Sequence, residues 1–254
     1  MSSVSAGAPN SHWPYPRFIA HRGGGTLAPE NTLAGFREAR HCCFQGIETD
    51  VMLTADGAAV LSHDPVLGRV VKSASPVASL SLKEIKTLDA GSLTAQKWAG
   101  ERIPTLEEAI ETCEANGLFM NIEIKPASES AAQATAQETV RIVRKLFAGK
   151  SLPLLSSFSR NALAAAAVEA PEIPRGLLLE GIPTDWKEAC MKLAVKTVHP
   201  DWQSVTPDFV EEAHAMGLGV MCYTVDSPDT ADALFTLGVD AVCTNRLDLF
   251  ADCR

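Results

Sequence analysis

Two carboxylates separated by one residue are the first candidates for chemistry in this sequence. Glu48 and Asp50 lie in an apolar segment that is predicted to be a β-strand, and residues i and i+2 of a strand share one face. The two side chains are therefore expected to project together, about 7 Å apart along the strand. Buried carboxylates are costly unless a cation neutralises them, and their oxygens suit Mg²⁺ or Ca²⁺. A solvated face on an edge strand is the alternative.

A histidine is predicted to lie beside this carboxylate pair. The segments 47–53 and 58–63 are joined by Thr54-Ala55-Asp56-Gly57, which is too short for a helical crossover, so they should pair as an antiparallel hairpin. His63 follows the centre of this loop by as many residues as Thr49 precedes it, which places His63 next to the carboxylates. A core histidine bonded to a neighbour is the alternative.

A glycine-rich turn follows the first predicted strand. His21-Arg22-Gly23-Gly24-Gly25 could bring backbone N–H groups close to an anion, and Arg22 could bind phosphate through two donors. The alternative is a plain turn with a surface histidine and arginine.

A further strand carries a carboxylate and an ammonium on one face. In the segment 121–125, Ile122 and Ile124 share one face, while Glu123 and Lys125 share the other. These two charged residues could form a structural ion pair. Equally, Glu123 could be a third metal ligand and Lys125 a phosphate contact.

Other polar groups stand where later predicted strands end, and each could line the mouth of a barrel. They are Ser156-Ser157-Phe158, His199-Pro200-Asp201, Tyr223-Thr224 and Thr244-Asn245. The serines lack the G-x-S-x-G context of a hydrolase nucleophile, and no P-loop or dinucleotide fingerprint is present.

Short apolar strands alternating with amphipathic helices must position these residues. This alternation predicts a parallel sheet, and at 254 residues a (β/α)8 TIM barrel is the leading architecture, with a doubly wound sheet second. Because there are nine strand candidates, one must lie outside a strict barrel, which would be distorted. The candidates are 18–21, 47–53, 58–63, 118–125, 152–156, 175–180, 197–200, 218–225 and 241–244.

The barrel is expected to be one catalytic domain over 17–254, preceded by a flexible extension over 1–16. Capping signals at Thr105, Thr206 and Ser227 predict helix starts. Residues 64–103 form a long stretch between the third strand and the next full helix. We expect a small insertion there, beside the site.

Composition excludes several classes of partner. Lys and Arg total 22 against 31 Asp and Glu, a net charge of −9 without a basic run, so nucleic-acid binding and stable membrane insertion are not expected. An anionic substrate would need a local positive site. No apolar run approaches ~18 residues and no signal peptide is recognisable, so a cytoplasmic protein is expected. The seven scattered cysteines are interpreted as reduced thiols.

Taken together, the polar motifs resemble those of the glycerophosphodiester phosphodiesterases, especially the short cytosolic bacterial members. The order and spacing agree from about residue 17 to the C-terminus. The matching motifs are His21-Arg22-Gly23 with Pro29-Glu30-Asn31-Thr32, Glu48-x-Asp50, Thr54-x-Asp56-Gly57, His63-Asp64 and Glu123-Ile124-Lys125.

This resemblance implies metal-dependent hydrolysis of glycerophosphodiesters to sn-glycerol 3-phosphate and an alcohol such as choline, ethanolamine or glycerol. It implies one divalent ion, Mg²⁺ or Ca²⁺, and either water or the substrate's own hydroxyl as the nucleophile. The implied metal ligands are Glu48, Asp50 and Glu123, the acid/base pair is His21 and His63, and the substrate contacts are Arg22, Lys125 and Tyr223.

Three positions depart from the family's pattern and bear on substrate range. The chain has Val225-Asp226 where the family often has Val-Asn, Thr244-Asn245 where it often has Thr-Asp, and Val70 after Arg69 where Thr is common. A lysophospholipase D of the same family, or a phosphate-ligand binding protein without turnover, are the alternatives. A homodimer is left open as the assembly.

Overall fold

Side-chain caps define where the helices around the sheet begin. Thr105 accepts a hydrogen bond from the Glu108 amide while the Glu108 carboxylate accepts one from the Thr105 amide, and this capping box starts α3 (Leu106–Ala115). Thr206 and Ser227 cap α7 (Pro207–Ala215) and α8 (Pro228–Thr236), each with proline at the first position. All three predicted starts are confirmed.

Eight parallel strands close into a barrel, so the predicted TIM-barrel fold is confirmed. The computed structural model describes residues 13–250. The closing contact is made where Ala20 pairs with Ile47. Each predicted strand segment is present; the parallel strands are β1 (Phe18–Ala20), β2 (Gly46–Leu53), β4 (Phe119–Ile124), β5 (Leu154–Ser157), β6 (Arg175–Leu179), β7 (Thr197–Pro200), β8 (Gly219–Cys222) and β9 (Ala241–Thr244).

The ninth strand, β3 (Ala59–Leu61), lies outside the ring and pairs antiparallel with the end of β2. Val51 opposes Leu61 and Leu53 opposes Ala59. Continued by two residues, this register sets His63 opposite Thr49, as the hairpin argument predicted. The hairpin distorts the barrel, because β2 is longer than its neighbours and carries a partner beyond the ring.

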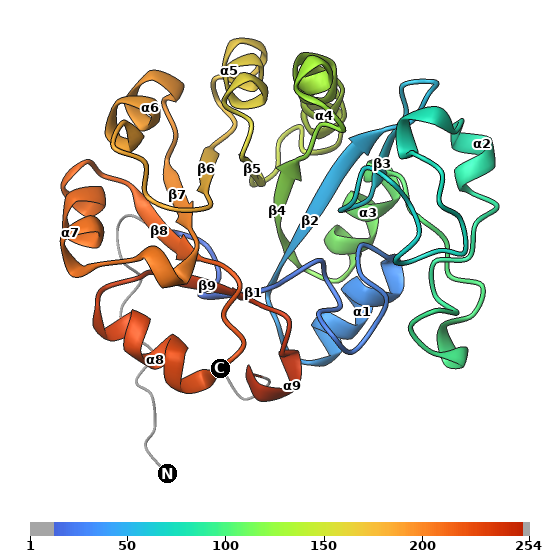
Figure 1. Ribbon diagram of the computed structural model, residues 1–254, viewed down its shortest axis with the longest axis horizontal. Helices are drawn as coiled ribbons and strands as arrows, with labels where there is room; N and C mark the ends of the chain where they lie inside the picture. Colours follow the sequence, from blue (N-terminus) through green and yellow to red (C-terminus); the bar gives the residue numbers. More distant parts are fainter. Residues whose placement is uncertain (1–12, 251–254) are drawn as a thin grey trace.

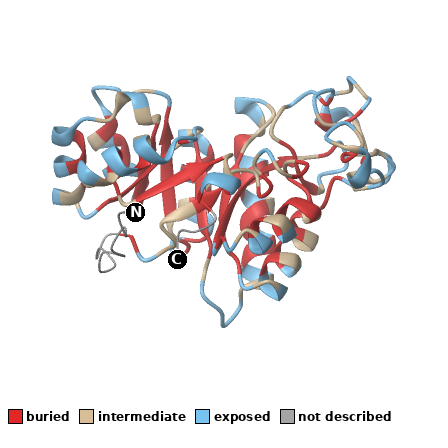
Figure 2. Ribbon diagram, turned by 90° about the horizontal axis from the view of Figure 1, so that it is seen from below, coloured by how far each residue is buried: buried red, intermediate tan, exposed pale blue. Residues whose placement is uncertain are grey.

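Helices cover the outside of the barrel between consecutive strands (Figure 1). Their outward faces are exposed, whereas the strands are buried (Figure 2). Besides those named above, the helices are α1 (Leu33–His41), α4 (Ala132–Leu146), α5 (Arg160–Glu169), α6 (Trp186–Leu193) and the short α9 (Leu247–Phe250).

A separate apolar cluster fills the interior of the barrel and includes Ile19, Leu154 and Met221. Trp13 belongs to this cluster and is 4% exposed, with its ring edge against His199. A flexible N-terminal extension was expected over residues 1–16. Within it, Trp13 is packed in this cluster, and residues 1–12 lie outside the described residues.

Residues 64–103 form a lobe beside β3, with α2 (Leu82–Ile85) as its helix (Figure 1). It has its own small core, which includes Leu67, Val77 and Ile85 packed with Met52 of β2. Ser81 and Glu84 form a capping box at the start of α2. The lobe is anchored to the barrel rather than loosely attached.

The pairing state of the cysteines and the length and hydropathy of the helices can be stated for the described residues. The six cysteines among residues 13–250 are free thiols, and four of them are buried. Within the same residues, no helix is both long enough and apolar enough to cross a membrane.

Candidate active site

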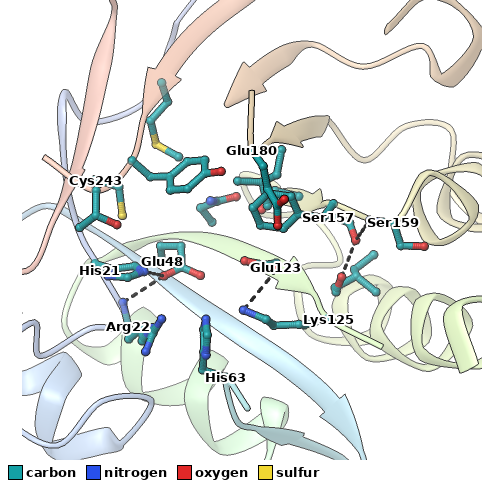
Figure 3. Close-up of a pocket in the computed structure, with 18 of the residues that line it drawn as sticks. His21, Arg22, Glu48, His63, Glu123, Lys125, Ser157, Ser159, Glu180 and Cys243 are labelled. Carbon is teal, nitrogen blue, oxygen red and sulfur yellow. Dashed lines mark hydrogen bonds and ion pairs between the residues drawn. The ribbon is translucent and has the colours of Figure 1, made fainter. Parts of the chain in front are cut away.

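A cavity of about 790 Å³ opens at the carboxyl ends of the barrel strands. This is the end at which barrels of this architecture carry their active sites. Of the predicted site residues, all but Asp50 line the cavity, and Asp50 lies buried just beneath it. Those lining residues are Tyr223 and the six labelled in Figure 3, namely His21, Arg22, Glu48, His63, Glu123 and Lys125.

Three buried carboxylates converge at the cavity floor. Glu48 and Asp50 project from the same face of β2, and the register of β2 with β4 sets Asp50 opposite Glu123. Each of the three offers an oxygen within 4.8 Å of the others. The predicted third member of the group is thus in place, because β4 is the barrel neighbour of β2.

Asp50 is the best neutralised of the three. Lys125 Nζ lies 3.0 Å from Asp50 Oδ1, and the Asn31 amide donates to Oδ2 at 2.8 Å. Burial alone would raise the pKa of Asp50, but the charges of Lys125, His63 and Arg22 together with the Asn31 bond lower it to about 2. Asp50 is therefore ionised at neutral pH.

The other two carboxylates are short of positive charge. Burial, followed by the charge of Asp50, raises the pKa of Glu123 to about 8 and that of Glu48 well above its ordinary range. Lys125 Nζ lies 3.7 Å from Glu123 Oε1, which does not compensate. Three converging hard oxygen donors with unbalanced charge fit a divalent cation such as Mg²⁺ or Ca²⁺.

His21 is held by an amide rather than a carboxylate. Its Nδ1 lies 2.7 Å from Asn245 Oδ1, and the Asn245 amino group donates to Asp226 Oδ2 at 3.1 Å. A carboxylate accepts only, so Asp226 fixes which end of the Asn245 amide faces His21. His21 therefore carries its proton on Nδ1, and Nε2, 3.9 Å from Glu48, keeps its lone pair.

His63 is held by a carboxylate. Its Nδ1 lies 2.7 Å from Asp64 Oδ1, and Asp64 also accepts from Arg69 Nε at 2.8 Å. Since Asp64 is an acceptor, the Nδ1 proton of His63 points at it and Nε2 is left bare. Arg69 continues the network to Glu30, which also accepts from Arg22 at 3.1 Å. The 64–103 lobe thus supports the site through Asp64 and Arg69.

Arg22 lies in a strained turn that directs its backbone amide toward Glu48 at the cavity floor. Its φ of 51° lies in the left-handed region, and its amide donates to Glu48 Oε2 at 3.0 Å. The guanidinium Nε is buried without a hydrogen-bond partner among the described residues. It forms a longer ion pair with Asp50 Oδ2 at 3.9 Å, while Nη1 pairs with Glu30 at 3.1 Å.

The glycines of this turn do not cradle an anion, which was one of the two interpretations that the sequence left open. The amides of Gly23, Gly24 and Gly25 donate to carbonyls of their own turn. A Cβ at Gly23 would come within 2.3 Å of the Phe36 ring, and one at Gly25 within 2.2 Å of the Asn245 carbonyl. These glycines allow close packing, and sequence alone does not separate that use from anion binding.

The other side of the cavity is built from the ends of β5 to β8. Phe158, Glu180, Asp201 and Tyr223 each follow their strand by one residue and line the cavity. The Tyr223 hydroxyl donates to the Leu179 carbonyl at 2.9 Å, so the ring and not the hydroxyl faces the cavity. Tyr223 is therefore a wall of the site.

Four supporting residues were not assigned a role from the sequence. They are Glu30, Asn31, Asp226 and Asn245. Asn31 binds both Asp50 and Thr49, which fixes the middle of β2. The position of Asn245 in the chain could have indicated its role. Asn245 follows β9 as His21 follows β1, and these two strands are neighbours.

Comparison with known proteins gives one consistent family. The model of the Glycerophosphoryl diester phosphodiesterase family matches residues 21–249. A glycerophosphodiester phosphodiesterase of Caldanaerobacter subterraneus subsp. tengcongensis is 34% identical over 228 residues, covering 89% of this chain and 93% of the relative. A probable glycerophosphodiester phosphodiesterase 2 of Mycobacterium tuberculosis is 31% identical, covering 92% and 89%.

Solved structures agree with this result. The chain superposes on a phosphodiesterase of Oleispira antarctica in complex with the product sn-glycerol-3-phosphate, with a TM-score of 0.89, 34% identity and coverage of 92% and 95%. A glycerophosphodiester phosphodiesterase of Agrobacterium tumefaciens gives 0.78 at 27% identity, covering 93% and 99%. The resemblance drawn from the motifs is confirmed, and the chain belongs to the glycerophosphoryl diester phosphodiesterase family.

Proposed function

We propose that this protein is a metal-dependent hydrolase of glycerophosphodiesters that releases sn-glycerol 3-phosphate and an alcohol. One observation carries the proposal. Two imidazoles, each with its Nδ1 committed to a fixed acceptor, line the same cavity as three converging buried carboxylates. The product complex of the Oleispira relative supports the same reaction.

Glu48, Asp50 and Glu123 would hold one divalent ion, Mg²⁺ or Ca²⁺. Such an ion, when bound, polarises a phosphoryl oxygen and offsets the charge of its carboxylate ligands. The raised pKa values of Glu48 and Glu123 support this assignment, because an added cation would let both carboxylates ionise.

The chain's own cations would bind and orient the phosphate. The Arg22 guanidinium is paired with Glu30 and Asp50, and Lys125 is anchored by Asp50; each has further N–H donors to offer. Both residues line the cavity on the side of the carboxylates. They would hold the phosphorus where the two imidazoles can reach the entering and leaving oxygens.

His21 and His63 would move the protons. One imidazole would take a proton from the nucleophile through its bare Nε2. The other would first bind a proton from solvent at its own Nε2 and then give that proton to the departing alkoxide. Asn245 and Asp64 hold the two rings in the orientation that this needs. Two histidines oriented in this way favour turnover over binding alone.

Soluble head groups are favoured over lipid-tailed substrates. A lysophospholipase D would need an apolar entrance, for which the 64–103 lobe is the place to look. The large exposed hydrophobic residues of that lobe are Val66 and Leu93, and neither lines the cavity. The cavity lining combines carboxylates and serines with the rings of Phe158 and Tyr223.

The proposal is tested by glycerol 3-phosphate release from glycerophosphocholine by purified protein. We expect release that stops with EDTA and returns with Mg²⁺ or Ca²⁺. Absence of release with either ion, from protein whose circular dichroism shows it folded, would contradict the proposed reaction. Tight binding of the diester without release would favour the binding-only alternative.

A further inference from the structure

We propose that the β5–β8 side of the cavity binds the alcohol part of the diester and selects alcohols that carry a positive charge, such as choline and ethanolamine. This inference rests on the proposed function and adds the substrate class. It starts from an asymmetry of charge across the cavity, shown in Figure 3, where Glu180 faces the cavity from the side opposite His63 and Arg22.

Positive and negative groups are separated in this cavity. Among the residues that line it, the only Lys and Arg are Arg22 and Lys125, both on the side of the carboxylate triad. The far side presents Glu129, Glu180 and Asp201 without a basic residue among its lining. A ligand with an anionic phosphate at one end and a cation at the other would match both sides.

Glu180 has the most capacity to bind a cation. Asp201 accepts from the Gln203 amide, and Glu129 accepts from Ser159 and Asn161. Glu180 makes no hydrogen bond or ion pair with the described residues, and it reaches the cavity directly from the end of β6. A ligand ammonium would be its first charged partner.

Aromatic rings complete this side. Phe158 is 39% exposed and meets Tyr223 edge to face, with ring centroids 5.8 Å apart. The bond from the Tyr223 hydroxyl to the Leu179 carbonyl holds its ring in place. Aromatic faces beside a carboxylate are a favourable setting for an ammonium group, and above all for a quaternary one.

Three of the hydroxyl groups on this side already donate within the protein. Ser157 donates to the Ile124 carbonyl, Ser159 to Glu129, and Tyr223 to Leu179. The charged groups of this side are acceptors, and with the ring faces they suit an ammonium group, which needs only acceptors and ring faces.

Two buried polar side chains lie in the floor that the two sides of the cavity share. Ser156 Oγ and both polar atoms of Asn121 have no hydrogen-bond partner among the described residues, and each residue is at most 1% exposed. Ser156 pairs with Glu123 on one side and with Gly176 of β6 on the other, so the floor is continuous between the carboxylates and the β5–β8 side.

The test compares kcat/KM for glycerophosphocholine with kcat/KM for glycerophosphoglycerol, whose alcohol is neutral. We expect the wild-type protein to prefer glycerophosphocholine, and Glu180→Gln to lower the ratio of the two values by about fivefold. Phe158→Leu is expected to lower it as well. Glu188→Gln removes an exposed charge from α6, outside the cavity lining, and should keep the wild-type ratio.

Two results would overturn the inference. If Glu180→Gln lowers both values by the same factor, Glu180 serves the shared glycerophosphate part of the substrates. If the ratio is unchanged in both Glu180→Gln and Phe158→Leu, this side does not read the charge of the alcohol. Failure of the proposed function looks different, because neither diester would be hydrolysed by the wild-type protein.

Discussion

The two sides of the cavity differ in how firmly other residues hold their functional groups. On the β1–β4 side, each functional group is held by a second residue: His21 by Asn245, His63 by Asp64, and Asp50 by Lys125 and Asn31. On the β5–β8 side, Glu180 makes no bond to the described residues and Phe158 is partly exposed.

This difference predicts where substitutions impair hydrolysis of every substrate and where they only alter substrate preference. A group that must meet reacting atoms within a fraction of an ångström needs a supporting shell, so its loss should impair every substrate. A group that only contacts the departing alcohol can be looser, and its loss should alter preference. The sharpest tests are those that impair one side and leave the other intact.

The largest expected effect comes from removing the ion or a ligand on the β1–β4 side. EDTA, or Glu123→Gln, should lower the hydrolysis of every diester by about 10³-fold or more, because phosphoryl polarisation and charge compensation are lost together. Steady-state rates before and after metal add-back measure this. Glu123→Gln should still fold, because a carboxyl with a pKa raised to about 8 is already neutral without metal at pH 7. Rescue of Glu123→Gln by ordinary metal concentrations would argue against its role as a ligand.

Removing either imidazole should come next. His21→Ala and His63→Ala are each expected to lower kcat by about 10²- to 10⁴-fold, which is the usual contribution of a positioned acid or base. Both variants should lower it equally for cationic and neutral alcohols. Near wild-type turnover in His63→Ala would remove this residue from the mechanism.

Metal-free protein should lose stability as the pH rises toward 8. Burial and Asp50 raise the folded pKa of Glu123 from 4.5 to about 8, so between these values the folded state binds a proton that the unfolded state releases. The free energy of unfolding should therefore fall with rising pH in this window. Glu123 contributes up to about 1.4 kcal/mol per pH unit, and Glu48, whose pKa is also raised, adds a contribution of the same sign. Urea titrations at several pH values in EDTA measure the slope. A slope as steep in Glu123→Gln would assign it to another group.

The support of His21 should matter less than His21 itself. Asn245→Leu is expected to lower kcat by about tenfold, within the range seen when a supporting hydrogen bond to a site histidine is lost. Asp226→Asn should have a smaller effect, because Asn245 can then present either end of its amide. The ¹⁵N NMR shifts of His21 report the tautomer directly. An unchanged tautomer together with reduced activity would contradict the positioning role.

The smallest effect is expected at the Tyr223 hydroxyl. Its bond to the Leu179 carbonyl directs it away from the cavity, so Tyr223→Phe should change kcat/KM by no more than about threefold. Tyr223→Ala should instead lower the preference for glycerophosphocholine, because the ring face is lost. A large defect in Tyr223→Phe would show that the hydroxyl contacts substrate.

Local signals predicted much of the fold and the acidic floor. Capping boxes act within four residues, and the hairpin register follows from the length of its loop, so the start of α3 and the position of His63 were readable from the sequence. The pairing of Asp50 with Glu123 followed once β2 and β4 were neighbours.

The supporting residues could not be predicted in the same way. Asn245 meets His21 only because the last strand closes against the first, and the amide orientation depends on Asp226 from a third segment. The role of the glycines after His21 was left open because close packing and anion binding require the same residue. Such contacts depend on closure of the barrel, which no local pattern encodes.

The most direct test of the division between the two sides is a kinetic comparison of two variants on two substrates. kcat/KM would be measured for His63→Gln and Glu180→Gln with glycerophosphocholine and glycerophosphoglycerol. The account predicts that His63→Gln lowers both values by the same large factor, while Glu180→Gln lowers mainly the value for glycerophosphocholine. The account is contradicted if His63→Gln changes the preference between the two diesters, or if Glu180→Gln lowers both values alike. In either case the two sides do not separate catalysis from selection of the alcohol.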